Sequence, residues 1–130
     1  MHKQEVRIRG NFRTEDGGVA RCRMVEAYIM EYHGIRYSIY RTPEECKPPK
    51  GCRWTVGVVM AGLWIKHADT LQEARALIPA SHELVQHYLV KWWKALAAGR
   101  HDDNPLDPPA NELTDAEYCT LNDWEAGCQA

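Results

Sequence analysis

Cationic and aromatic side chains interleaved along one part of the chain carry its most suggestive chemistry. Between residues 36 and 66, cations fall on predicted outer strand positions or in the loop between two strands, and Tyr40 and Trp64 lie among them. The cations are Arg36, Arg41, Lys47, Lys50, Arg53 and Lys66. A wet sheet face of this kind can hold phosphates and stack bases. Cations are also routine on solvated strands, so they do not by themselves identify a partner. The pattern predicts a surface that binds either nucleic acid or a protein.

Two histidines resemble a zinc-protease helix at first sight, but their spacing argues against a shared metal. That motif needs histidines four residues apart so that both face one ion. His82 and His87 are five apart, which places them about 140° apart around a helix. We therefore expect a solvated His82 and a His87 beside the core.

The cysteines also lack a recognisable metal or catalytic pattern. Cys22, Cys46, Cys52 and His67 could together supply four zinc ligands, but Cys46 and Cys52 are too far apart for a zinc knuckle. A nucleophile elbow such as GxSxG is absent from the sequence. We predict that the protein is not an enzyme and that it needs no cofactor and no metal.

Charge is divided unevenly along the 130 residues. Residues 1–100 hold all 16 Lys and Arg against 10 Asp and Glu, a net +6, whereas residues 101–130 hold 8 Asp and Glu and no Lys or Arg. This division predicts a basic domain over residues 1–100, a proline-rich linker over 101–111 and an acidic tail over 112–130. The tail could cover the basic face, offer its carboxylates to a basic partner, or be a solvated segment that aids solubility.

A short helix is predicted within the acidic tail, over residues 112–126. Thr114 and Glu117 have capping-box spacing, and Leu113 is placed to form a hydrophobic staple. The side chains expected on one face are Tyr118, Leu121 and Trp124. Because a helix of this length is marginal alone in water, these residues should dock on the body or on a partner.

Strand patterns dominate the first half of the chain. Residues 24–32 and 35–41 are rich in β-branched and aromatic residues and are joined by His33-Gly34, which predicts a tight hairpin. One face of the second strand should pack, while the other face, including Ser38 and Tyr40, should be wet. Residues 53–60 and 63–67 predict a second hairpin, and residues 5–9 an edge strand or a loose arm.

Helical spacing begins near residue 70. A capping box opens a helix that Pro79 should end, and a second helix is predicted over residues 81–98. Its apolar stripe contains Leu84, Val85, Tyr88, Leu89, Trp92 and Leu96. Strands that precede helices indicate an α+β fold. We expect an antiparallel sheet of about four strands in two hairpins, covered on one face by two helices, with the short C-terminal helix in the acidic tail.

A resemblance covers residues 24–80. The segments YHGIRY at residues 32–37 and ADTLQEA at residues 68–74, in the order hairpin, hairpin, helix, resemble small bacterial domains of the double-stranded-RNA-binding or HicB antitoxin kind. The shared motifs are structural, so the resemblance implies a fold and assigns no functional residue.

Composition bounds the function further. The chain is 45% hydrophobic and contains no apolar run near the roughly 20 residues of a membrane helix. Its charged N-terminus and odd number of cysteines favour the cytoplasm. We expect a small non-catalytic binding protein that acts through protein–protein contacts. A compact non-enzymatic chain with a charged appendage is similar to accessory proteins of phages and mobile elements, including anti-CRISPR inhibitors that antagonise a host nucleoprotein machine. The alternative is a nucleic-acid-binding domain similar to double-stranded-RNA-binding domains; the partner and the oligomeric state stay open.

Overall fold

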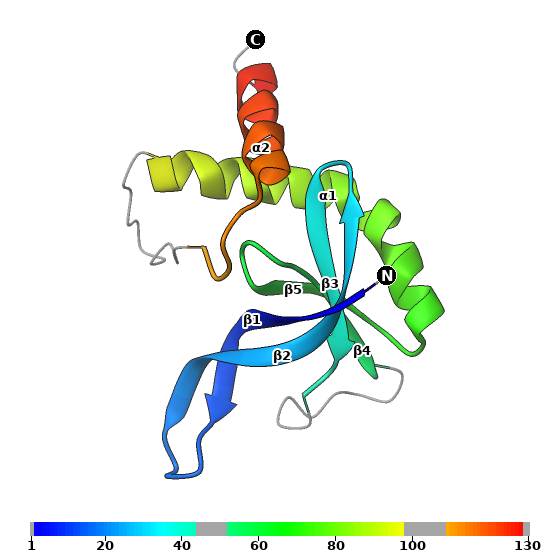
Figure 1. The fold of residues 1–130 in the computed structure, drawn as a ribbon, viewed down its shortest axis with the longest axis vertical. Coiled ribbons are helices and arrows are strands. Elements are labelled where there is room, and N and C mark those ends of the chain that lie inside the picture. Colours follow the sequence, from blue (N-terminus) through cyan, green and yellow to red (C-terminus); the bar gives the residue numbers. More distant parts are fainter. Residues whose placement is uncertain (1, 44–51, 98–108, 129–130) are drawn as a thin grey trace.

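A five-stranded antiparallel sheet and two helices make up the protein (Figure 1). The structure is a computed structural model and describes residues 2–43, 52–97 and 109–128. The strands are β1 (His2–Arg13), β2 (Val19–Tyr32), β3 (Ile35–Arg41), β4 (Trp54–Val58) and β5 (Leu63–Ala68). Neighbours in sequence are neighbours in the sheet. The α+β class is confirmed, but the predicted count of about four strands was wrong, because the segment expected to be an edge strand or a loose arm forms a fifth strand, β1, at one end of the strand order.

The predicted β2–β3 hairpin is confirmed at its expected turn. Tyr32 pairs with Ile35, which leaves His33 and Gly34 as the two turn residues. Their φ angles are 49° and 84°. Positive φ at both central positions defines the tight turn whose twist matches that of the flanking strands.

The sheet coils, so its second face is not simply wet as predicted. The backbone N–H of Arg9 in β1 donates to the carbonyl of Gly62, beside β5, at 2.8 Å. This closure covers Ser38 and Tyr40, which are both buried. A small apolar cluster fills the concave side, formed by Val6, Ile8, Phe12, Ala27, Ile29, Tyr40 and Val59. The expectation of a solvated face at these positions was wrong because it treated the sheet as flat.

One helix stands where the sequence predicts two. The helix α1 (Leu71–Ala97) continues through Pro79 and bends along its length in Figure 1. Proline removes one backbone hydrogen bond and crowds the preceding turn, which a helix held by tertiary packing can absorb as a bend. The predicted stop at Pro79 was therefore wrong, although the capping box is present, with Thr70 Oγ1 accepting from the Glu73 N–H at 3.1 Å.

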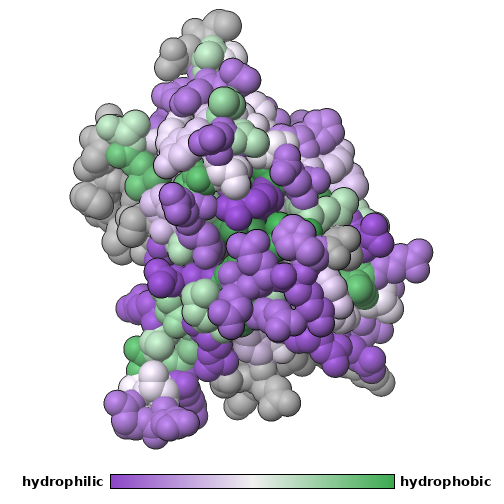
Figure 2. Space-filling view, viewed as in Figure 1, coloured by the Kyte–Doolittle hydropathy of each residue, from purple (hydrophilic) through white to green (hydrophobic). Residues whose placement is uncertain are grey.

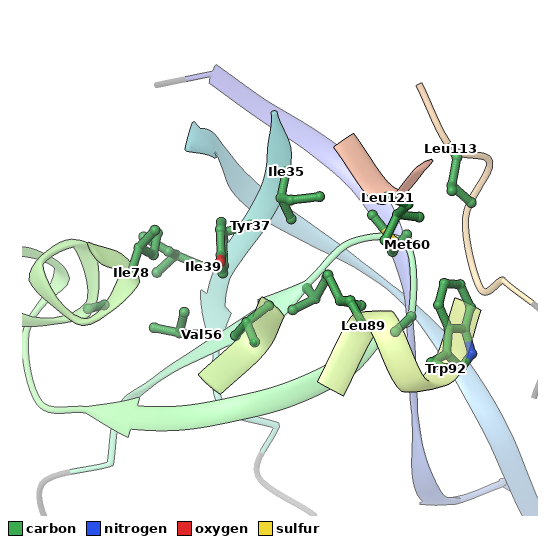
Figure 3. Packing of buried hydrophobic residues seen from close by; sticks show 14 of the residues in the cluster. Ile35, Tyr37, Ile39, Val56, Met60, Ile78, Leu89, Trp92, Leu113 and Leu121 are labelled. Atoms are coloured by element: carbon green, nitrogen blue, oxygen red, sulfur yellow. The ribbon is translucent and has the colours of Figure 1, made fainter. Parts of the chain in front are cut away.

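The main core lies between the convex face of the sheet and the helices. Figure 3 shows Ile35, Tyr37 and Ile39 of β3 facing α1, with Leu113 and Leu121 from the C-terminal segment in the same cluster. Trp92 is buried there, as its position in the α1 stripe predicts.

The helix α2 (Asp115–Cys128) packs on α1 and β3. Its predicted capping box is present: Glu117 accepts from the Thr114 N–H at 3.0 Å, and Thr114 Oγ1 accepts from the Glu117 N–H at 3.2 Å. The segment before it is also tied to the body, because Asn111 bonds both the N–H and the carbonyl of Arg7 at 2.9 Å. The C-terminal residues thus contribute to the main core as well as carrying acidic charge.

Candidate functional site

A groove between the β4–β5 hairpin and α1 is a mostly apolar hollow on the surface that the structure describes. Its volume is about 330 Å³. The lining residues are Val58, Leu63, Trp64, Ile65, Leu84, Val85 and Tyr88. The exposed fractions of Trp64, Leu84 and Tyr88 are 58%, 64% and 43%. Three large exposed apolar side chains around one hollow make the groove a candidate interaction surface, because single exposed apolar residues are ordinary whereas clusters are not.

The helix side of this groove follows from helical spacing. Leu84, Tyr88 and Lys91 lie at i, i+4 and i+7, so they form one exposed row beside the buried row of Val85, Leu89 and Trp92. The sequence prediction merged both rows into a single core stripe, and that was wrong for Leu84 and Tyr88. Each residue of the exposed row directly precedes a residue of the buried row in the sequence, and the sheet covers only the buried row.

Two exposed cations lie close in sequence to groove-lining residues of β5 and α1. Lys66 follows Ile65 on β5, and Lys91 extends the exposed row of α1; both side chains are exposed. A partner surface that combines apolar side chains with neighbouring carboxylates is therefore electrostatically complementary to the groove.

A second hollow lies on the concave face of the sheet, on the other side of Trp64. Its volume is about 400 Å³. It is lined by Ile8, Arg9, Gly10, Phe12, Tyr40, Thr42, Pro43, Thr55, Trp64 and His67. Two register irregularities build it: one in β1 between Arg9 and Phe12, and one in the β4–β5 pairing between Val56 and Gly57. The second irregularity lets Trp64 and His67 stack with ring centroids 4.9 Å apart. Bulges commonly re-aim side chains in this way next to functional sites.

A histidine and tyrosine cluster lies where the β2–β3 turn meets α1 and α2. The Tyr37 hydroxyl and His82 Nδ1 are 2.6 Å apart, and Trp124 of α2 packs edge-on against the His82 ring. Burial, and secondarily Tyr32, raises the pKa of Tyr37 well above its usual range. Burial, with a further contribution from His33, lowers the pKa of His82. The cluster holds α2 in place, and His82 is half-buried rather than solvated as predicted.

The predicted basic residues that the structure describes have different surroundings. The side chain of Arg36 is 14% exposed and pairs with Glu117 at 3.0 Å, and Tyr40 is buried on the concave side. Arg41 lies over the Trp54 ring, and Arg53 pairs with Asp69 at 3.5 Å. Of the remaining predicted residues, Trp64 lines the groove, Lys66 is exposed on β5, and Lys47 and Lys50 lie outside the described residues.

The predicted residues of α2 differ in their surroundings. Leu121 is fully buried, and Trp124 is half-buried against His82. Tyr118 is mostly exposed, with its ring edge-on to Trp93 at 5.8 Å. Sequence reasoning missed Glu117 as a buried partner of Arg36, because the two residues meet only in the fold.

Further cations that sequence reasoning did not single out lie along β1 and β2. The exposed cations there are Lys3, Arg7, Arg13 and Arg21. Figure 2 shows that the face over these two strands is mostly hydrophilic. Carboxylates of Glu5, Glu26 and Asp16 are interspersed, so the strands carry mixed charge.

The parts of the chain that the structure describes contain neither a metal-binding cluster nor a helix able to cross a membrane. No three His, Cys, Asp or Glu side chains gather there in a way that could hold a metal ion, and Cys46 of the hypothetical zinc set lies outside those parts. Neither helix, over its described residues, combines the length and apolar character needed to cross a membrane.

Comparison with protein-family models, curated proteins and solved structures finds no match to this chain.

Proposed function

We propose that this chain is a non-catalytic, cytoplasmic binding protein that docks a partner protein in the groove between β5 and α1. The observation that carries the proposal is the clustering of Trp64, Leu84 and Tyr88, all substantially exposed, around one apolar hollow. Aromatic side chains beside a hollow are typical anchors of protein interfaces.

The partner is proposed to be a protein segment that inserts apolar side chains and carries carboxylates beside them. Lys66 and Lys91 are exposed, lie close in sequence to groove-lining residues, and favour this charge sign. Duplex nucleic acid on the predicted sheet face has less support, because Arg36 is held by Glu117 and Tyr40 is buried.

Peptide selection tests the proposal. A random displayed peptide library is panned against the full chain and counter-selected against a Leu84→Glu variant. Selected peptides should combine apolar anchors with Asp or Glu and should lose at least about 10-fold in affinity for Leu84→Glu, the scale of a hot-spot loss.

The matched control is Val19→Glu on β2, because Val19 and Leu84 are both 64% exposed. Val19→Glu should bind the selected peptides as the parent chain does. Selected peptides that are basic, or that lose equal affinity for both variants, would contradict the proposal. A parent chain that self-associates through the groove, and becomes monomeric in Leu84→Glu, would replace the partner protein with a second copy.

A further inference from the structure

The outer edge of β5 borders the proposed docking groove, and among the described residues no strand other than β4 pairs with β5. β5 stands at one end of the strand order and β1 at the other. The two ends meet where the Arg9 N–H donates to the carbonyl of Gly62, just before β5 begins. Beyond that bond, β1 continues into the long hairpin with β2, whereas β5 leads to α1 (Figure 1). The backbone groups of β5 that face away from β4 are therefore a template for a further strand.

Two hollows lie on either side of this edge. One is the docking groove, which Leu63, Trp64 and Ile65 line. The other is the hollow on the concave face of the sheet, the concave pocket, which Trp64 and His67 line. Successive side chains of an extended chain point to opposite faces. A strand added to β5 would therefore place alternate side chains in the groove and the intervening ones in the concave pocket.

The helix α1 is positioned to cover such a strand. It packs on β3, β4 and β5, the last of which ends the sheet. Its buried residue Val85 and its exposed residues Leu84 and Tyr88 all line the groove. The exposed row of α1 thus matches the position of a sixth strand beside β5. A helix laid in the groove would bury the same row but would leave the β5 edge and the concave pocket unused.

Two features of β5 restrict which segment can add to it. The β4–β5 register skips Ile65, and Lys66 is exposed. Bulges and edge lysines are devices by which proteins limit indiscriminate pairing of edge strands. Lys66 favours a segment that carries a carboxylate nearby. β5 itself contains no Asp or Glu, so a second copy of this strand lacks that complementary charge.

We propose that the occupant of the docking groove is an extended, acidic segment of a partner protein that adds a strand to the outer edge of β5. This inference rests on the proposed function, because it names the form that the docked segment takes. Main-chain hydrogen bonds to β5 provide affinity, and side chains that enter the two hollows provide specificity. The apolar anchors of the segment then occur at every second position, whereas those of a docked helix recur at intervals of three and four.

An N-methyl scan of the tightest peptide selected against the full chain tests this inference. Only every second N–H of an added strand faces β5. N-methylation of those peptide bonds should weaken binding at least about 10-fold, because each methyl group removes a donor to β5. N-methylation of the intervening bonds, which face away from β5, is the matched control and should leave the affinity within about 2-fold.

Amide hydrogen exchange on the chain gives a second readout. In the free chain, the amides of residues 63–68 that face away from β4 should exchange faster than those paired with β4. Bound peptide should slow the exchange of these outward amides at least about 10-fold, because they then donate to the added strand. Leu84→Glu should lose this protection together with the peptide, whereas Val19→Glu should keep both.

Three results would overturn the added strand. One is an N-methyl scan without a period of two, together with outward β5 amides that the peptide does not protect. The second is selected peptides whose apolar residues recur at intervals of three and four, which would identify a docked helix. The third is a parent chain that dimerises with its outward β5 amides already protected, which would identify a second copy as the occupant.

Failure of the strand is distinguishable from failure of the docking groove. Peptides that lose affinity for Leu84→Glu and keep it for Val19→Glu, yet show either of the first two results, leave the groove as the docking site and overturn only the strand. Panning that selects no peptide at all would overturn the groove and the strand together.

Discussion

Removal of the Glu117 carboxylate should destabilise the protein strongly, because that carboxylate joins α2 to the sheet. Glu117 is fully buried, and its oxygens accept from the Arg36 Nε at 3.1 Å and from the Thr114 N–H at 3.0 Å. Glu117→Ala leaves the largely buried guanidinium of Arg36 without its carboxylate, a loss of about 3–5 kcal/mol for a broken buried pair. Arg36 keeps one bond, from Nη to the Glu112 carbonyl at 2.7 Å, so we expect the lower half of that range.

Chemical denaturation and a thermal melt measure this effect. A loss of about 3 kcal/mol should lower the melting temperature by roughly 10 °C in a domain of this size. The matched control is Asp69→Ala, which removes the exposed Arg53–Asp69 pair and should cost less than about 1 kcal/mol. The double variant Arg36→Met with Glu117→Leu should recover most of the loss, because apolar residues of similar volume can replace a buried pair. If Glu117→Ala cost no more than Asp69→Ala, the buried pair would not hold α2, and our explanation of its docking would be refuted.

The remaining predictions concern the core and the turn. The lowered pKa of His82 means that its neutral form is favoured in the folded state, so stability should be fully present above pH 6.5 and decline as the pH falls through the folded-state pKa. His82→Gln should flatten this decline in pH-dependent melts, and equal curves for the parent and His82→Gln would contradict the assignment. Gly34→Val should lower the melting temperature, because φ at residue 34 is 84° and an added Cβ would collide with the Thr120 hydroxyl of α2. An unchanged melting temperature would show that the turn does not require glycine at this position. Trp92→Ala should cost about 3–5 kcal/mol of unfolding free energy by denaturation, and a cost below about 1 kcal/mol would show that the ring is not a core element.

Local signals in the sequence predicted local structure well. The His33-Gly34 turn and the Thr114–Glu117 capping box both appear as expected, because their geometry depends on residues within a few positions of each other. Burial of Trp92 also followed from helical spacing alone.

Features that depend on residues far apart in the sequence could not be predicted from it. The Arg36–Glu117 pair joins residues 81 positions apart, and the concave pocket requires β1 to coil back to β5. The α1 row of Leu84 and Tyr88 looked like core because apolar spacing shows which residues share a helix face, and only the packing shows which face is covered. Tyr40, which the sequence placed on a wet basic face, is buried for the same reason, since coiling of the sheet covers it.

The most direct test of the docking groove is an NMR map of where a selected peptide binds on the full chain. Backbone amide signals of residues 63–65 and 84–88 should shift as the peptide is added, and those of the β1–β2 strands near Val19 should not. A peptide that bound specifically yet left residues 84–88 unperturbed would contradict the assignment of the groove as the partner-binding surface.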